Sequence, residues 1–227
     1  MTAPSTTETK SGGPALPRVF VLGSSLTIHF GPWLEKALEG HFAYDRKRDS
    51  GGERAEDNLD IPQGASAGDS SQVLAYLRLR REQDPIPADI LLLSCGLHDI
   101  RTDPATGRRH LSDARFESNL QKIIGECDAM NLRLVWLRIP PVVEVIHNSR
   151  SRAFHRFTAD VDSCNRIADR VMRGAEVDII DLHHFCQALL PDALIDHVHY
   201  NEGARKQQAA FIATELRNLY SSHSPNS

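Results

Sequence analysis

Four short segments of the chain carry residue types that could together perform acyl transfer. Ser25 stands in Gly-Ser-Ser-Leu-Thr, Gly68 in Gly-Ala-Ser-Ala-Gly-Asp-Ser-Ser and His98 in Gly-Leu-His-Asp, while Asp196 and His199 stand three residues apart in Asp-His-Val-His. A serine hydroxyl is a poor nucleophile until a base takes its proton, and a histidine suits that task at neutral pH. A carboxylate can hold the histidine in the required tautomer. The set therefore predicts a triad of Ser25, His199 and Asp196 that attacks an ester through an acyl-serine intermediate.

Each of these residues also has a simpler interpretation. Ser24 and Ser25 could be no more than helix caps, which is common work for serine. Gly68 could be an ordinary turn glycine, and Asp196 could cap the last helix. His197 competes with His199 for the role of base, but the spacing from Asp196 and the Tyr-Asn-Glu-Gly segment that follows favour His199.

Taken in order, the segments resemble the blocks of the SGNH (GDSL-type) hydrolase family over roughly residues 18 to 219. The family's first block, Gly-Asp-Ser-Leu, stands here as Gly-Ser-Ser-Leu, so the resemblance implies that Ser25 is the nucleophile. It implies that the oxyanion hole is formed by the amides of Ser25 and Gly68 together with the side chain of His98. The final Asp-x-x-His block maps to Asp196 and His199.

Two residues depart from the family pattern. Ser24 replaces the aspartate of the first block, which is not a member of the triad. His98 replaces the asparagine of the third block, whose amide donates a hydrogen bond to the oxyanion. A neutral imidazole can still donate one N–H, so His98 could keep that role.

The apolar runs alternate between strand-sized and helix-sized segments. Strands are predicted at 18–22, 89–93, 132–139 and 177–182, the last of these as the fifth strand of the sheet. Helices are predicted at 32–38, 70–81, 113–130, 154–172 and 203–220, with 44–60 mostly loop. Such alternation is typical of an α/β fold with a covered parallel sheet. We therefore expect a three-layer, doubly wound, flavodoxin-like fold with a mainly parallel five-stranded sheet. Its site should lie beyond the carboxyl ends of the strands.

Length and composition fit one domain. The chain has 227 residues, of which 41% are hydrophobic and 25% charged. We expect a disordered N-terminal tail at 1–16, a single SGNH-hydrolase-like domain at 17–220 and a disordered C-terminal tail at 221–227. The formal net charge of -4 gives no reason to expect nucleic acid or a membrane as partner. Four dispersed cysteines and an N-terminus without a signal-peptide pattern favour a cytoplasmic protein.

No metal or organic cofactor is expected. The chain has no HExxH motif, no Cys/His cluster at ligand spacing and no glycine-rich phosphate motif. The adjacent His183 and His184 fit the surface of a helix better than a zinc site.

Two arginine-rich segments follow the third block and the Pro-Pro pair at 140–141. They contain Arg101, Arg108, Arg109 and His110, and then Arg150, Arg152 and Arg156. Both could edge the pocket and bind an anionic substrate group, because arginine suits carboxylate and phosphate. The alternative, which we favour from the sequence alone, is a solvated rim.

The resemblance implies a carboxylic ester hydrolase. Its substrate would be a small-molecule or carbohydrate ester, from which it releases a small acyl group such as acetyl. One alternative is an O-acyltransferase that uses the same triad with an alcohol acceptor. Another is a catalytically weak member that binds esters or glycans, because of His98.

Overall fold

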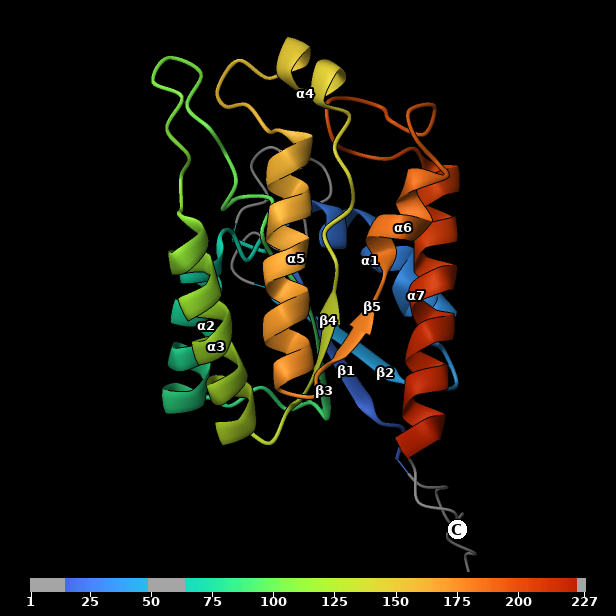
Figure 1. Ribbon diagram of the computed structural model, residues 1–227. Helices are drawn as coiled ribbons and strands as arrows, with labels where there is room; N and C mark the ends of the chain where they lie inside the picture. The colour runs from blue at the N-terminus through green and yellow to red at the C-terminus, as the bar shows by residue number, and fades with distance from the viewer. Residues whose placement is uncertain (1–14, 49–63, 224–227) are drawn as a thin grey trace, which may run out of the picture.

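Five strands form one sheet in which every neighbouring pair is parallel, in the order β2-β1-β3-β4-β5. The computed structural model describes residues 15–48 and 64–223 (Figure 1). The strands are β1 (Arg18–Gly23), β2 (Ala43–Arg46), β3 (Ile90–Ser94), β4 (Arg133–Leu137) and β5 (Asp178–Ile180). The carboxyl ends of all five therefore meet at one edge, which is the upper edge in Figure 1.

Helices cover both faces of this sheet. They are α1 (Ser25–Leu38), α2 (Ser70–Gln83), α3 (Asp113–Ala129), α4 (Glu144–Arg150), α5 (Thr158–Gly174), α6 (Leu182–Gln187) and α7 (Glu202–His223). On one side α2 packs on α3 and α3 on α5, and on the other side α1 packs on α7 (Figure 1). The predicted three-layer α/β fold is confirmed.

The sheet forms the centre of the core because its middle strands are apolar on both faces. All five residues of β3 are buried, and β3 is hydrogen-bonded to β1 on one side and β4 on the other. A strand between two helix layers needs no polar face, which is why the run Ile-Leu-Leu-Leu shows no alternation.

The sequence prediction missed β2, which lies in the segment expected to be mostly loop. Its four residues, Ala-Tyr-Asp-Arg, are polar or small, and only Arg46 among them is fully buried. An edge strand pairs on one side only, here with β1, so it needs little hydrophobic pattern to form. Residues 49–60 of that segment lie outside the described residues.

Helix boundaries also differ from the prediction. α1 begins at Ser25 rather than at 32 and contains Pro32, because burial of Leu26, Ile28 and Phe30 outweighs the lost backbone hydrogen bond. α5 begins at Thr158 rather than at 154. The short α4 was not predicted, since its only fully buried residue is His147.

The closing helix α7 continues to His223, past the predicted end at 220. The tails predicted at 1–16 and 221–227 fall mostly outside the described residues, which begin at 15 and end at 223.

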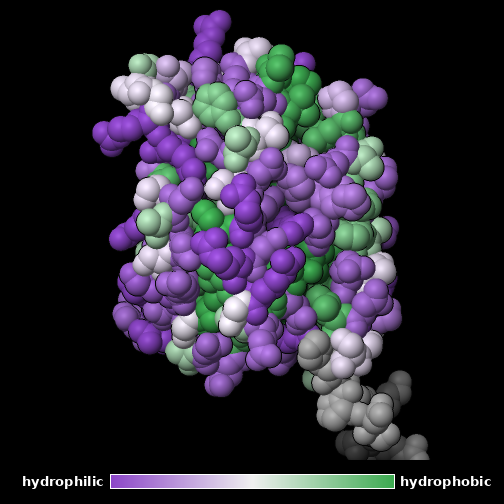
Figure 2. All heavy atoms as spheres, in the orientation of Figure 1, coloured by the Kyte–Doolittle hydropathy of each residue, from purple (hydrophilic) through white to green (hydrophobic). Residues whose placement is uncertain are grey.

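The face shown in Figure 2 is mainly hydrophilic, with hydrophobic side chains at the upper edge over α4. Val145 on that helix is 81% exposed. Among the helices that the structure describes, none has the length and apolar character to cross a membrane.

Gly96, just after β3, gives a test of how the fold holds the third block. Its φ is +134°, and a Cβ there would lie 2.5 Å from Cys164 Sγ. Gly96→Ala should lower the free energy of unfolding by roughly 1–3 kcal/mol through overpacking, measured by urea denaturation. The control is Gly125→Ala in α3, where nothing lies within 4 Å of a new Cβ. That change should raise stability by about 0.5–1 kcal/mol, and equal stability of the two variants would contradict this account.

Candidate active site

The structure brings Ser25, His199 and Asp196 into one hydrogen-bonded chain. His199 Nε2 lies 2.9 Å from Ser25 Oγ, and His199 Nδ1 lies 2.6 Å from Asp196 Oδ2. With the Nδ1 proton donated to the carboxylate, Nε2 is left to accept from the serine hydroxyl. His199 is 3% exposed, so its ring is held in place by packing as well as by these bonds.

The loop before α7 is folded around Asp196. Its Oδ1 accepts the backbone N–H groups of Val198 and His199, both at 2.7 Å. Burial raises the pKa of Asp196, but the hydrogen bonds from His199 and Val198 outweigh that effect and hold the pKa well below its usual range. Asp196 is therefore a carboxylate at neutral pH, as an orienting partner for His199 must be.

Ser25 owes its position to the turn from β1 into α1. Ser24 is the N-cap of α1, but its side chain makes no capping hydrogen bond, and Ser25 is the first residue of the helix. The first amides of a helix have no intrahelical acceptor. The backbone N–H of Ser25 can therefore face negative charge that develops beside its own hydroxyl.

His197 packs near this chain of residues. Its ring lies edge-on to the rings of His147 and His199, with centroid distances of 4.9 and 6.0 Å. Its Nδ1 is 3.8 Å from Asp196 Oδ1. The imidazole that is hydrogen-bonded to Ser25 is that of His199, the candidate favoured by the spacing.

The second block lies against the end of β1. The N–H of Ala67 donates to the carbonyl of Gly23 at 2.8 Å, which places Gly68 one residue beyond that contact. Gly68 has a φ of +70°, and a Cβ there would collide with the side chain of Gln72. Its N–H donates to Ser66 Oγ at 3.2 Å. An oxyanion would have to take the place of that hydroxyl.

Asp69 and Asp99 brace the loops and do not contact the triad. Asp69 caps α2 in a capping box with Gln72, and its Oδ2 is 2.9 Å from His110 Nε2. Asp99 is fully buried and accepts both the N–H and the hydroxyl of Ser70, the first residue of α2. Burial raises the pKa of Asp99 to about 6, against the effect of those hydrogen bonds.

His98 follows β3 in a turn, and its carbonyl accepts Nε of Arg101 at 3.1 Å. Burial, followed by the nearby charges of Arg156 and Arg101, lowers the pKa of His98 to about 3. The imidazole is therefore neutral at pH 7, with one N–H to donate. Among the described residues neither ring nitrogen has a hydrogen-bond partner. That N–H is free for a ligand, although its role as an oxyanion donor stays a prediction.

His29 belongs to the site and was not recognised from the sequence. It lies one helical turn after Ser25 on α1, and its ring stands edge-on to His199 with centroids 5.6 Å apart. Burial and the charges of Arg205 and His199 lower the pKa of His29 to about 4. The four-residue spacing from Ser25 is the signal that could have found it, because such residues share a helix face.

In the part of the chain that the structure describes, no group of three His, Cys, Asp or Glu residues could hold a metal ion. His183 and His184 lie on α6, where His183 Nδ1 is 3.0 Å from the carbonyl of Ile139.

Comparison with known proteins shows the fold. No family model and no curated protein sequence matches the chain. A lipase/acylhydrolase from Enterococcus faecalis is 15% identical at a TM-score of 0.65, with 90% of this chain and 97% of that one covered. A GDSL-like lipase from Bacteroides thetaiotaomicron is 12% identical at a TM-score of 0.61, with 90% of this chain and 89% of that one covered. Est24, a carbohydrate acetylesterase from Sinorhizobium meliloti, is 13% identical at a TM-score of 0.58, with 89% of this chain and 99% of that one covered. The chain has the SGNH-type hydrolase fold.

The buried histidines predict how stability depends on pH. Burial and the neighbouring Arg156 lower the pKa of His147 to about 4. The pKa of His29 is lowered to about 4 and that of His98 to about 3. Between pH 6.5 and 4 the unfolded chain then binds more protons at these sites, so stability falls on acidification. Asp99, whose pKa is raised, works in the opposite direction. One carboxyl should not outweigh three imidazoles.

Chemical denaturation at pH 7, 6, 5 and 4.5 measures this slope. His147→Gln keeps an acceptor for Arg156 and removes the titration, so its slope should be shallower than that of the wild type. Identical slopes, or wild-type stability that rises towards pH 4.5, would show that these histidines do not resist protonation in the folded protein.

Proposed function

We propose that this chain is a serine-dependent carboxylic ester hydrolase. The observation that carries the proposal is the continuous hydrogen-bonded chain from Ser25 Oγ through His199 to Asp196. Nucleophile, base and orienting carboxylate stand in the order that acyl transfer requires.

Two steps complete the reaction. In the first, Ser25 Oγ attacks the ester carbonyl carbon while its proton passes to His199 Nε2. The tetrahedral intermediate then expels the alcohol, which takes that proton, and leaves the acyl group on Ser25. In the second, His199 removes a proton from water, which attacks the acyl-serine, and the acid leaves as Ser25 Oγ regains the proton. Asp196 stays ionised throughout and stabilises the imidazolium.

Negative charge on the carbonyl oxygen would be stabilised by three donors. These are the amide of Ser25 at the start of α1, the amide of Gly68 and the ring N–H of His98. The low pKa of His98 supports this role, because a charged imidazole there would disfavour protonation of His199. Gly68 would exchange its bond with Ser66 for one with the oxyanion.

We propose that the acyl group is small, such as acetyl, and that the alcohol is a sugar or a similar hydroxyl compound. Support comes from the fold neighbours, which include an acylhydrolase and a carbohydrate acetylesterase. The same acyl-serine could instead pass to an alcohol. Adding acceptor alcohols and measuring acylated product separates transfer from hydrolysis.

The triad is tested with pairs of variants, in which each substitution of a triad residue is compared with the same substitution at a nearby serine or histidine. Ser25→Ala and His199→Ala should each lower kcat for a neutral acetyl ester by roughly 10⁴-fold or more. Ser24→Ala and His197→Ala should keep a substantial part of it. A fluorophosphonate should label the wild type on Ser25 and leave Ser25→Ala unlabelled. An adduct on Ser24 would overturn the assignment, and no adduct with no turnover would favour a binding protein.

The proposed donor His98 is tested by restoring the family residue. Loss of one oxyanion donor typically lowers kcat by about a hundred- to a thousand-fold, so the kcat of His98→Ala should be lower than that of the wild type by that factor. His98→Asn should keep much of the rate, because the amide also donates an N–H. Urea denaturation of both variants checks that the fold is intact. Unchanged turnover in a folded His98→Ala would leave the oxyanion to backbone amides alone.

A further inference from the structure

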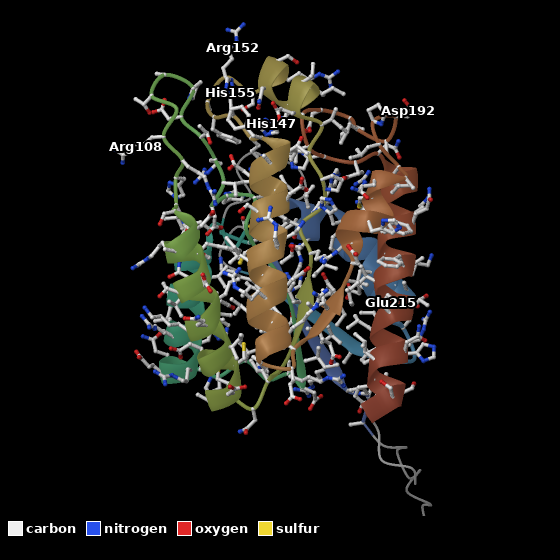
Figure 3. All side chains as sticks on the ribbon, viewed as in Figure 1. Arg108, His147, Arg152, His155, Asp192 and Glu215 are labelled. Carbon is white, nitrogen blue, oxygen red and sulfur yellow. The ribbon has the colours of Figure 1, made fainter. Side chains whose placement is uncertain are left out.

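A cavity of about 450 Å³ opens at the carboxyl-end edge of the sheet, between the loop after the third block and the segment before α5. Its lining includes the basic residues Arg101, Arg108, Arg109 and His110, the ring of Phe154 and one carboxylate, Asp103. Figure 3 shows Arg108 at the outer side of this loop, with its side chain reaching outward.

Two guanidinium groups beside this cavity lack a carboxylate partner. Arg101 and Arg156 both lie over the ring of Phe154, at 5.5 and 4.8 Å from its centroid. Neither forms an ion pair with any residue that the structure describes, whereas Arg109 pairs with Asp113 and Asp160. Asp103 accepts the backbone N–H groups of its own turn, at Ala105 and Thr106. The two guanidinium groups over Phe154 are therefore left without an ion-pair partner among the described residues.

Arg156 makes that excess charge costly, because its side chain is only 4% exposed. It donates to the carbonyl of Leu97 at 2.7 Å and to His147 Nε2 at 2.9 Å, both neutral acceptors. Burial and the charge of Arg101 lower the pKa of Arg156 to about 9. An anion in the adjacent cavity would offset the repulsion between the charges of Arg156 and Arg101. If these arginines formed only a solvated rim, that repulsion would have no counter-charge.

Hydrogen bonds join the lining of the cavity to the two segments that carry the proposed oxyanion donors Gly68 and His98. Arg101 Nε donates to the carbonyl of His98 at 3.1 Å. His110 Nε2 is 2.9 Å from Asp69, the residue after Gly68. A group bound at Arg101 therefore lies next to the segment that carries His98, so a substrate could extend from Ser25 past His98 into the cavity.

We propose that this cavity binds an oxyanion group, carboxylate or phosphate, carried by the ester substrate, with Arg101 as its main contact. The proposal rests on the proposed ester hydrolysis and adds the substrate class, an anionic ester. Arginine suits the role because its planar fork can donate two parallel hydrogen bonds to carboxylate or phosphate. The outward-reaching Arg108 and the charge of Arg156 add attraction at longer range.

The kinetic test uses acetyl esters of hydroxyalkanoic acids of graded chain length, each paired with the neutral amide of the same acid. The graded length allows the carboxylate to reach the cavity whatever its span from Ser25. At the best length KM should be about tenfold lower for the carboxylate than for its amide, the effect of one charge-assisted hydrogen bond. Inorganic phosphate should inhibit turnover competitively, which tests the phosphate arm.

Three variants locate the effect. Arg101→Gln should remove most of the preference for the carboxylate and the inhibition by phosphate, while Arg101→Lys should retain part of both. The control is Arg152→Gln, which removes an equal charge from the same corner. The side chain of Arg152 points away from the rest of the molecule, at the top of Figure 3. It should keep the preference. Any effect of Arg101 on His98 would change carboxylate and amide turnover alike and leave their ratio unchanged.

The possible outcomes separate this proposal from the proposed function. Ser25-dependent turnover with equal KM for carboxylate and amide at every length would overturn the anion site and leave the hydrolase intact. A preference that survives Arg101→Gln would also overturn it. If no ester is hydrolysed, phosphate binding is measured by calorimetry on the full chain. Binding lost in Arg101→Gln and kept in Arg152→Gln supports the site, and no binding overturns it.

Discussion

The buried contact between Asp99 and Ser70 is the interaction on which the arrangement of the site loops depends. Asp99 ends the turn after β3 and Ser70 begins α2, so their hydrogen bonds join the third block to the second. Asn119 of α3 donates to Ser70 Oγ at 2.8 Å and ties a second helix to the same point. A raised pKa of about 6 is the cost of placing a carboxylate there. The Ala67–Gly23 hydrogen bond and the pairing of β3 with β1 tie each block to β1, and the Asp99–Ser70 contact fixes the two blocks relative to each other.

The layers of the fold could be predicted from the sequence, but its edges could not. Burial on both faces leaves an unambiguous signal in β3, a run of four large apolar residues bounded by polar ones. β2 has one partner strand and only one fully buried residue, so its pairing with β1 comes from tertiary structure and not from a local pattern. The start of α1 was hidden for a related reason, since Pro32 normally marks a helix start and here lies inside the helix.

In the candidate site too, residues marked by a local sequence pattern could be predicted, and residues marked only by tertiary contacts could not. Ser25, Asp196 and His199 could be identified because their types and spacing suggest one reaction, and the structure places them in hydrogen-bond contact. Their catalytic roles, with those of Gly68 and His98, stay predictions. His29 was missed, and Arg156 was recognised only as one of several arginines that could edge the pocket. What distinguishes each of them is burial beside another group: His199 for one, Phe154 and His147 for the other. Burial of this kind depends on contacts between distant segments.

The same two arginines connect the proposed oxyanion hole with the proposed anion site. Burial keeps His98 neutral, and the charges of Arg156 and Arg101 add to that effect. A substrate anion bound at Arg101 would offset part of that positive charge and raise the pKa of His98. Because burial is the largest cause of the low pKa, the imidazole would stay neutral while substrate is bound. Arg101 and Arg156, which have no carboxylate partner among the described residues, could therefore serve both proposed sites at one corner of the fold.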